Sequence, residues 1–213
     1  MPRSGIATRQ RILDEAIGIV SNESLSSLCL EKISERAGIT KRAFYTHFPS
    51  KDHFLASLVE HQRPHYVDRY RRWADACGPD ATARQRIASI SAGIATAAAD
   101  PHWKGCCFIR MTAELGNMQG HPVHQIVATA LRDLERWFAD ELARDGYGNA
   151  ESIASQLSVL INGLLMVQLV TRSASYGQTV MQLIDTIIPE KPATAWNGLR
   201  ISTAAAAAIA GRS

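Results

Sequence analysis

The stretch AGITKRAFYTHFPSK, residues 37–51, determines the fold that we expect for the N-terminal part of the chain. Gly38 fits a turn position with positive φ, which glycine adopts at the lowest cost. Thr40 is a suitable N-cap for a short helix over 41–48. Because periodic apolar residues also predict a helix over 30–37, the order is helix, glycine turn, helix, which is typical of a helix-turn-helix.

The same stretch holds three basic residues and no acidic residue. Lys41, Arg42 and Lys51 can point outward, whereas Phe44 and Phe48 fall on the side that must be buried. Basic side chains on the outer face of a short helix are suited to phosphates and to the guanine edge. The stretch therefore indicates a surface that contacts DNA.

Charge is distributed unevenly along the 213 residues. Residues 1–72 contain 12 Lys and Arg against 8 Asp and Glu, whereas the remainder contains 11 against 12. A basic N-terminal part on a nearly neutral body is what a polyanion-binding head requires, although a difference of this size also arises by chance.

The composition is that of a globular protein, with 46% hydrophobic and 20% charged residues. We find no apolar run of the length that spans a membrane and no secretory signal, so we expect no membrane partner. The four cysteines have no paired metal spacing, which favours reduced thiols in a cytoplasmic protein.

No segment has a convincing period of two residues, and we therefore predict an all-α fold. A helix from residue 51 is either kinked at Pro64 or restarted there. The other helices are expected at about 6–21, 30–37, 41–48, 81–99, 105–115, 123–144, 150–173 and 179–188. The expected division is a helix-turn-helix domain over 1–51, a helical domain over 52–188, and a tail over 189–213 that is a frayed helix or disordered.

Two segments resemble the TetR/AcrR family of transcriptional regulators. They are TRQRILDEA at residues 8–16 and LEKISERAGITKRAFYTHFPSKDHFL at residues 30–55. The resemblance implies a three-helix DNA-binding domain followed by a ligand-binding and dimerisation domain. One departure concerns Cys29, because members often carry Thr or Ser there, and a thiol is a poorer cap and a weaker donor.

The resemblance also implies that the helix over 41–48 enters the major groove of an operator. Lys41 and Arg42 are then placed for guanine edges or phosphates, and Arg42 is either a base-reading side chain or a phosphate clamp. For Tyr45 and His47 the alternatives to a phosphate contact are a half-buried ring and a packed histidine. The expected DNA-binding set is Thr40, Lys41, Arg42, Ala43, Tyr45, Thr46, His47 and Lys51.

For the body, the resemblance implies a homodimer formed by a helix pair and a pocket for a small, largely apolar effector. The helices over 123–144 and 150–173 are the candidates for the pair. The expected interface residues are Ile126, Ala130, Leu134, Trp137, Ile153, Leu157, Leu160 and Leu164. The expected pocket residues are Tyr66, Tyr70, Trp103, Phe108, Met111, Asn162, Met166 and Gln168, each of which, taken alone, is more readily interpreted as plain core than as a ligand contact.

The function that we expect is a ligand-responsive transcriptional regulator that binds a pseudo-palindromic operator as a dimer, with repression as the family default. Two alternatives of the same fold are a metal sensor, from histidine pairs such as His61 and His65, and a redox sensor, from Cys106 and Cys107. Alternatives of another class are a helical enzyme and a protein-interaction module. No catalytic, cofactor or metal motif is found, so we expect no enzyme and no cofactor.

Overall fold

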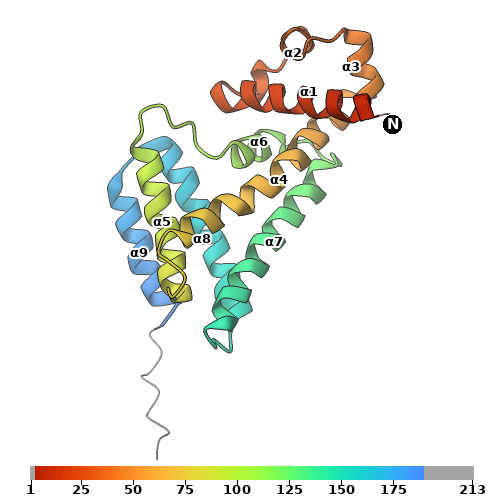
Figure 1. Ribbon diagram of the computed structural model, residues 1–213. Coiled ribbons are helices and arrows are strands. Elements are labelled where there is room, and N and C mark those ends of the chain that lie inside the picture. Colours follow the sequence, from red (N-terminus) through yellow and green to blue (C-terminus); the bar gives the residue numbers. More distant parts are fainter. Residues whose placement is uncertain (1–2, 190–213) are drawn as a thin grey trace, which may run out of the picture.

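The computed structural model describes residues 3–189, and within this range the chain is entirely helical (Figure 1). The all-α fold class is confirmed. A head formed by α1 to α3 lies at one end, and a larger helical body lies at the other (Figure 1). The elements are α1 (Arg3–Asn22), the 3-10 turn η1 (Leu25–Ser27), α2 (Leu30–Ala37), α3 (Lys41–His47), α4 (Lys51–Asp75), α5 (Ala83–Ala99), α6 (Cys107–Leu115), α7 (Val123–Arg144), α8 (Ala150–Thr171) and α9 (Ala174–Ile187).

The turn between α2 and α3 has the geometry that its sequence predicts. Gly38 has φ 61° and ψ 44°, and its N–H donates to the carbonyl oxygens of Ser34 and Glu35. The Thr40 hydroxyl accepts a hydrogen bond from the N–H of Ala43 at 3.1 Å and so caps α3. These local interactions fix the angle at which α3 leaves α2.

An aromatic cluster anchors the inner side of α3 to the rest of the head. The ring centroids of Phe44 and Phe48 lie 5.2 Å apart, and both lie 5.0 Å from that of Phe54 on α4. Phe44 and Phe48 are buried, as expected. The guanidinium of Arg9 on α1 lies 4.8 Å from the Phe48 centroid, which is cation–π distance.

Helix α4 joins the head to the body without interruption (Figure 1). Pro64 lies inside the helix, which therefore continues through this residue and does not restart there. Its first turns pack in the head, and its later residues Tyr66 and Tyr70 are buried in the body. Helix α4 therefore contributes to both parts of the molecule, and a domain boundary at residue 51 stays a prediction.

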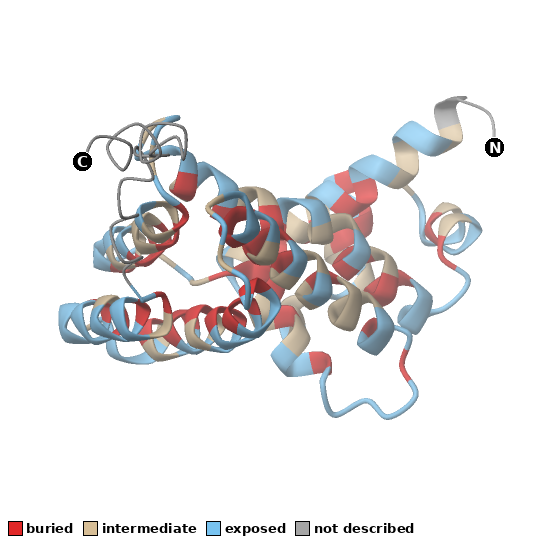
Figure 2. Cartoon of the chain, turned by 90° about the horizontal axis from the view of Figure 1, so that it is seen from below, coloured by how far each residue is buried: buried red, intermediate tan, exposed pale blue. Residues whose placement is uncertain are grey.

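The body is built from α4, α5, α7, α8 and α9, whose inner faces are buried together (Figure 2). The buried carboxylate of Glu141 on α7 accepts hydrogen bonds from Arg86 at 2.9 Å and Arg144 at 3.0 Å. Arg86 also donates to Asp75 at 2.7 Å. This network satisfies a buried charge and ties α5 and α7 to the end of α4.

The C-terminal part differs from the sequence prediction at one helix boundary. The prediction of a helix start near residue 179 is wrong, because α9 begins at Ala174 with Ser173 as its N-cap. Gly177 lies inside α9, where a Cβ would stand 3.4 Å from the Cβ of Ala95. The glycine therefore permits close packing of α9 on α5, and the predicted tail lies outside the described residues except for Pro189.

Helix α8 is the one helix within residues 3–189 that is long and apolar enough to cross a membrane. It packs against α5, α7 and α9, and one of its faces is buried in the chain. The core helix of a globular protein meets the same length and composition criteria, so this finding does not indicate a membrane protein.

Candidate nucleic-acid interface

The outer side of α3 and the start of α4 present the residues that the sequence predicts for DNA contact. Ala43 and His47 are half-buried beside the aromatic cluster. The exposed members of the set are Thr40, Lys41, Arg42, Tyr45, Thr46 and Lys51. Six of the eight predicted residues are thus accessible from solvent, whereas Phe44 and Phe48 are buried on the inner side of the head.

Lys41 is not free at this surface. Its ammonium nitrogen lies 2.5 Å from Oε1 of Glu31 on α2. This hydrogen bond raises the pKa of Lys41 and lowers the pKa of Glu31. Both side chains are more than half exposed, so the pair is weak and a phosphate can compete for the lysine.

Arg42 and Lys51 have side chains without a hydrogen-bond or ion-pair partner among residues 3–189. The contact of Arg42 with Thr46 is through the backbone of Arg42, whose carbonyl oxygen accepts a hydrogen bond from the Thr46 hydroxyl at 3.1 Å. The guanidinium itself is not engaged within these residues. A guanidinium with five free donors can form a bidentate contact to guanine O6 and N7 or to a phosphate. Of the two basic residues at the start of α3, Arg42 can therefore bind DNA without breaking an internal ion pair, whereas Lys41 is paired with Glu31.

Tyr45 and His47 occupy different environments. The Tyr45 ring is 54% exposed and lies edge-on to the Phe44 ring, with centroids 5.6 Å apart. Its position leaves the hydroxyl accessible. His47 has a buried Nδ1 that makes no hydrogen bond within the described residues, and its ring lies beside Phe48. Its exposed part alone can contact a phosphate.

The start of α2 lacks a side-chain cap. Cys29 occupies the N-cap position, and its thiol makes no capping hydrogen bond. The N–H groups of the first turn of α2 are therefore left for solvent or for an incoming anion. This agrees with the weaker cap predicted for a thiol in place of a hydroxyl.

Four of the eight residues predicted for an effector pocket lie together inside the body. The Tyr66 hydroxyl donates to Oδ1 of Asn162 at 2.7 Å, and the Tyr66 ring stacks on that of Phe108 at 4.6 Å. Tyr70 lies next to Tyr66, with ring centroids 5.1 Å apart. Met111 and Gln168 are also buried, whereas Trp103 is half-buried and Met166 is 40% exposed on the outer face of α8.

Burial changes the chemistry of the two tyrosines. It raises the pKa of Tyr66 to about 12 and raises the pKa of Tyr70 well above its usual value. Both side chains are therefore neutral phenols that can donate hydrogen bonds. The Tyr70 hydroxyl makes no hydrogen bond of ordinary geometry within residues 3–189.

The residues predicted for a dimer interface are mostly internal, which corrects that part of the sequence interpretation. Ile126 and Leu160 are half-buried. Buried within the single chain are Ala130, Leu134, Trp137, Ile153, Leu157 and Leu164. These six side chains pack inside the chain, between α7 and α8 and in the adjoining core. They are therefore not available to a second chain.

The candidates for metal and redox chemistry are placed as follows. No group of three or more His, Cys, Asp or Glu side chains suited to a metal ion occurs in the described part of the chain. His61 bonds Asp14 at 2.7 Å. Cys106 and Cys107 are buried, and burial raises the pKa of Cys107, which favours the unreactive thiol form.

Contacts of α1 with α4 and α6 were not visible in the sequence. The Arg110 guanidinium on α6 donates to the carbonyl oxygens of Val20 and Glu23 at the end of α1. Arg9 donates to the Ser57 hydroxyl at 2.8 Å. Each contact joins residues at least 48 positions apart, and no local pattern signals such pairs.

Comparisons with known proteins agree with this geometry. Residues 12–58, which span the head and the start of α4, match the family described as "Bacterial regulatory proteins, tetR family". The HTH-type transcriptional regulator YjdC of Escherichia coli is 22% identical over 84% of this chain and 93% of its own length. The regulator AcrR of Shigella flexneri is 40% identical over 53 residues, 25% of each chain.

Solved structures extend the likeness to the body. A putative TetR-type regulator from Streptomyces avermitilis has a TM-score of 0.68 and 25% identity, covering 84% of this chain and 97% of its own. A TetR-family regulator from Cytophaga hutchinsonii has the same fold, with a TM-score of 0.72 at 15% identity over 90% of this chain and all of its own. Residues 12–58 therefore carry the helix-turn-helix domain of the TetR family, and the chain as a whole has the fold of TetR-family transcriptional regulators.

Proposed function

We propose that this regulator is a repressor that binds a pseudo-palindromic operator as a dimer and releases it when a small molecule occupies the body. The observation that carries the proposal is the exposed outer side of α3, where the Arg42 side chain has no partner within residues 3–189 and follows Lys41 at the start of the helix. The aromatic cluster behind α3 holds the backbone of this helix in place. The Cα positions of the basic side chains are therefore fixed before DNA binds. We further propose that it acts in the cytoplasm, as soluble members of the family usually do.

In the proposed complex, α3 lies in the major groove. Arg42 and Lys41 contact guanine edges or adjacent phosphates, with Ala43 and Thr46 close to the bases. Thr40, Tyr45, His47 and Lys51 contact the phosphate backbone on the sides of the groove. One head makes few such contacts, so useful affinity requires two heads on half-sites separated by one helical turn or a multiple of it.

We propose that the dimer forms through α8 and α9. The exposed residues Val159, Gly163, Met166 and Val170 on α8 follow one another at intervals of four, three and four positions. This spacing places them in one stripe along the helix, as in a packed helix pair. Tyr176 and Leu183 on α9 add exposed apolar surface, and burial of both stripes against a second copy removes it from water.

We propose that the effector enters the core around Tyr66, Tyr70 and Asn162. Displacement of the stacked Phe108 ring gives an apolar ligand its space, and the Tyr70 hydroxyl offers a donor without an existing partner among residues 3–189. Because Tyr66 and Tyr70 lie on α4, their displacement moves the helix that also carries Lys51. A coupling of about 1–3 kcal/mol between the two sites is the usual size for such a system.

A selection on random DNA duplexes tests the proposal. The purified full-length protein is incubated with the duplex pool at a stated salt concentration, and bound sequences are amplified and read. The proposal predicts enrichment of a two-fold symmetric motif with half-sites about one or two helical turns apart. Enrichment of an asymmetric motif contradicts the dimer, and recovery of the unselected pool contradicts sequence-specific binding.

A further inference from the structure

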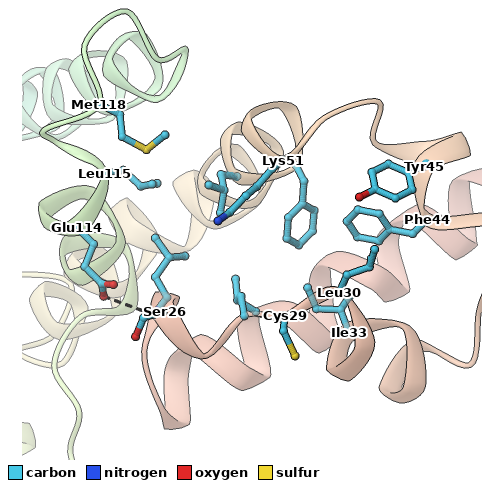
Figure 3. Close-up of a pocket in the computed structure, with 14 residues that line it drawn as sticks. Ser26, Cys29, Leu30, Ile33, Phe44, Tyr45, Lys51, Glu114, Leu115 and Met118 are labelled. Atoms are coloured by element: carbon cyan, nitrogen blue, oxygen red, sulfur yellow. Dashed lines mark hydrogen bonds between the residues drawn. The ribbon is translucent and has the colours of Figure 1, made fainter. Parts of the chain in front are cut away.

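A crevice lies between the head and the tip of α6, outside the core of the body. It has a volume of about 490 Å³, which is within the range of about 300–1,000 Å³ for small-molecule sites. Its walls come from η1 and α2 on one side, from α3 and the start of α4 on another, and from the end of α6 with the following loop (Figure 3). Three parts of the chain that are distant in sequence therefore meet around one space.

The interior of the crevice is apolar. Leu28, Ile33 and Phe54 line it from the head, and Leu115 and Met118 line it from α6 and its loop. Met118 is 36% exposed, although a methionine is usually covered when a packed surface is available. An apolar group placed here would remove exposed hydrophobic surface from water, which is favourable in proportion to the area covered.

The position of α6 fixes the width of the crevice. Arg110 of α6 donates to the carbonyl oxygens of Val20 and Glu23 at the end of α1. At the same side, the carboxylate of Glu114 accepts the N–H of Leu25 at 3.4 Å (Figure 3). These contacts span the crevice from head to body, so its two walls are held at a defined separation.

Lys51 places a positively charged ammonium group at the crevice. Its side chain extends along the edge of the crevice toward α6 (Figure 3). Its ammonium group has no ion-pair or hydrogen-bond partner within the part of the chain that the structure describes. Glu114 also lines the crevice, but its carboxylate accepts the N–H of Leu25 at 3.4 Å and forms no ion pair with Lys51. The free cation at the edge of an apolar space matches a ligand with an anionic end and an apolar remainder.

We propose that this crevice binds an amphipathic organic anion, such as a medium-chain carboxylate, at a site separate from the core of the body. The chain of the ligand lies among Leu28, Leu115 and Met118, and its carboxylate pairs with Lys51. A neutral alcohol of the same length fills the same space but leaves Lys51 unpaired. The anion therefore binds more tightly than the alcohol.

Occupation of the crevice has a consequence for DNA binding that rests on the proposed function. Tyr45 and Lys51 line the crevice and also belong to the proposed phosphate-contacting set. A carboxylate on Lys51 neutralises the charge that a phosphate would otherwise meet. The organic anion and DNA therefore compete, and linkage requires each to weaken the other by the same factor.

Two exposed cysteines provide a test that needs no DNA. Cys29 lines the crevice, whereas Cys77 lies at the far end of α4 and outside it. The full-length protein is treated with N-ethylmaleimide in the presence of decanoate below its micelle concentration, and the modification rate of each thiol is followed by peptide mass spectrometry. At about ten times the dissociation constant, the rate at Cys29 should fall about tenfold, because only the empty fraction reacts. The rate at Cys77 should stay unchanged.

The specificity of the site is tested with 1-decanol and with a pair of charge variants. Decanol should protect Cys29 less than decanoate at equal concentration. Met118→Glu places a carboxylate on the crevice wall and should remove protection by decanoate. Gln119→Glu adds the same charge to the neighbouring position, which does not line the crevice, and should leave protection in place.

Three results with the parent protein would contradict binding of the organic anion in the crevice. They are an unchanged rate at Cys29, equal slowing at Cys29 and Cys77, and equal protection by decanol and decanoate. Retained protection in Met118→Glu, with a circular dichroism spectrum like that of the parent, would also contradict it.

The competition with DNA is tested separately. Weaker operator binding in decanoate supports the competition. Protection of Cys29 without any change in operator affinity contradicts the competition but not the site. Failure to bind any operator contradicts the proposed function and leaves the thiol result to decide the site.

Discussion

Replacement of Arg42 by alanine removes a guanidinium that forms no hydrogen bond or ion pair within residues 3–189. The side chain is exposed, and no hydrogen bond or ion pair inside the described chain depends on it. Alanine also has a higher helix propensity than arginine by a small margin, so α3 should remain folded. The free energy of unfolding should therefore stay within about 0.5 kcal/mol of the parent, as for other exposed substitutions. Any larger effect must arise in the complex with DNA.

The size of that effect follows from the contact that Arg42 makes. A bidentate arginine–guanine contact contributes about 1–3 kcal/mol of discrimination, which corresponds to a loss of roughly 5- to 160-fold in affinity for the preferred base. A phosphate contact instead lowers affinity for every sequence by a similar factor. The two roles therefore differ in whether the loss depends on sequence.

Fluorescence anisotropy titrations distinguish these roles. The parent and Arg42→Ala are titrated with the selected duplex and with duplexes that carry each of the other three base pairs at every half-site position, at one fixed salt concentration. If Arg42 reads guanine, the variant loses its preference at one position in each half-site and keeps it elsewhere. Equal weakening on all duplexes would contradict base reading, and unchanged affinity on all of them would refute a role for Arg42 at the interface.

Three further substitutions test the surroundings of α3 and the dimer. Glu31→Gln should tighten DNA binding, because it frees Lys41 and removes a carboxylate near the phosphates. Fluorescence anisotropy measures the change in affinity, and Glu35→Gln on the same helix is the control. Thr40→Ala removes the cap bond to Ala43 and should lower the free energy of unfolding by about 1 kcal/mol in urea denaturation; an unchanged midpoint would refute the importance of the cap. Val159→Glu brings like charges together at the proposed interface and should yield monomers in sedimentation velocity, whereas the exposed α7 variant Gln125→Glu should remain dimeric.

The head could be predicted from the sequence because its determinants are local. Gly38 supplies the left-handed turn, and Thr40 caps a helix whose start lies one residue later. Phe44 and Phe48 are four positions apart, which places both on the inner side of α3. Each of these relations spans only a few residues, so the pattern of residue types alone determines the local structure.

The body and the crevice depend on contacts that the sequence does not display. Gly177 has the appearance of a helix break, but it allows α9 to pack closely on α5. The apolar residues of α7 and α8 suggest a dimer interface in the sequence, because a periodic stripe indicates burial without indicating which surface covers it. The side chain of Lys51 reaches toward α6, more than 50 positions along the chain, and only the folded chain brings them together.

Dimethyl sulfate protection of guanine N7 on the selected operator tests the central claim most directly, because N7 lies in the major groove. The account predicts that the wild-type protein protects guanines in two half-sites separated by one or two helical turns, and that Arg42→Ala loses protection at one guanine in each. A complex in which every guanine N7 in the bound site remains reactive would contradict the claim that α3 of each head lies in the major groove.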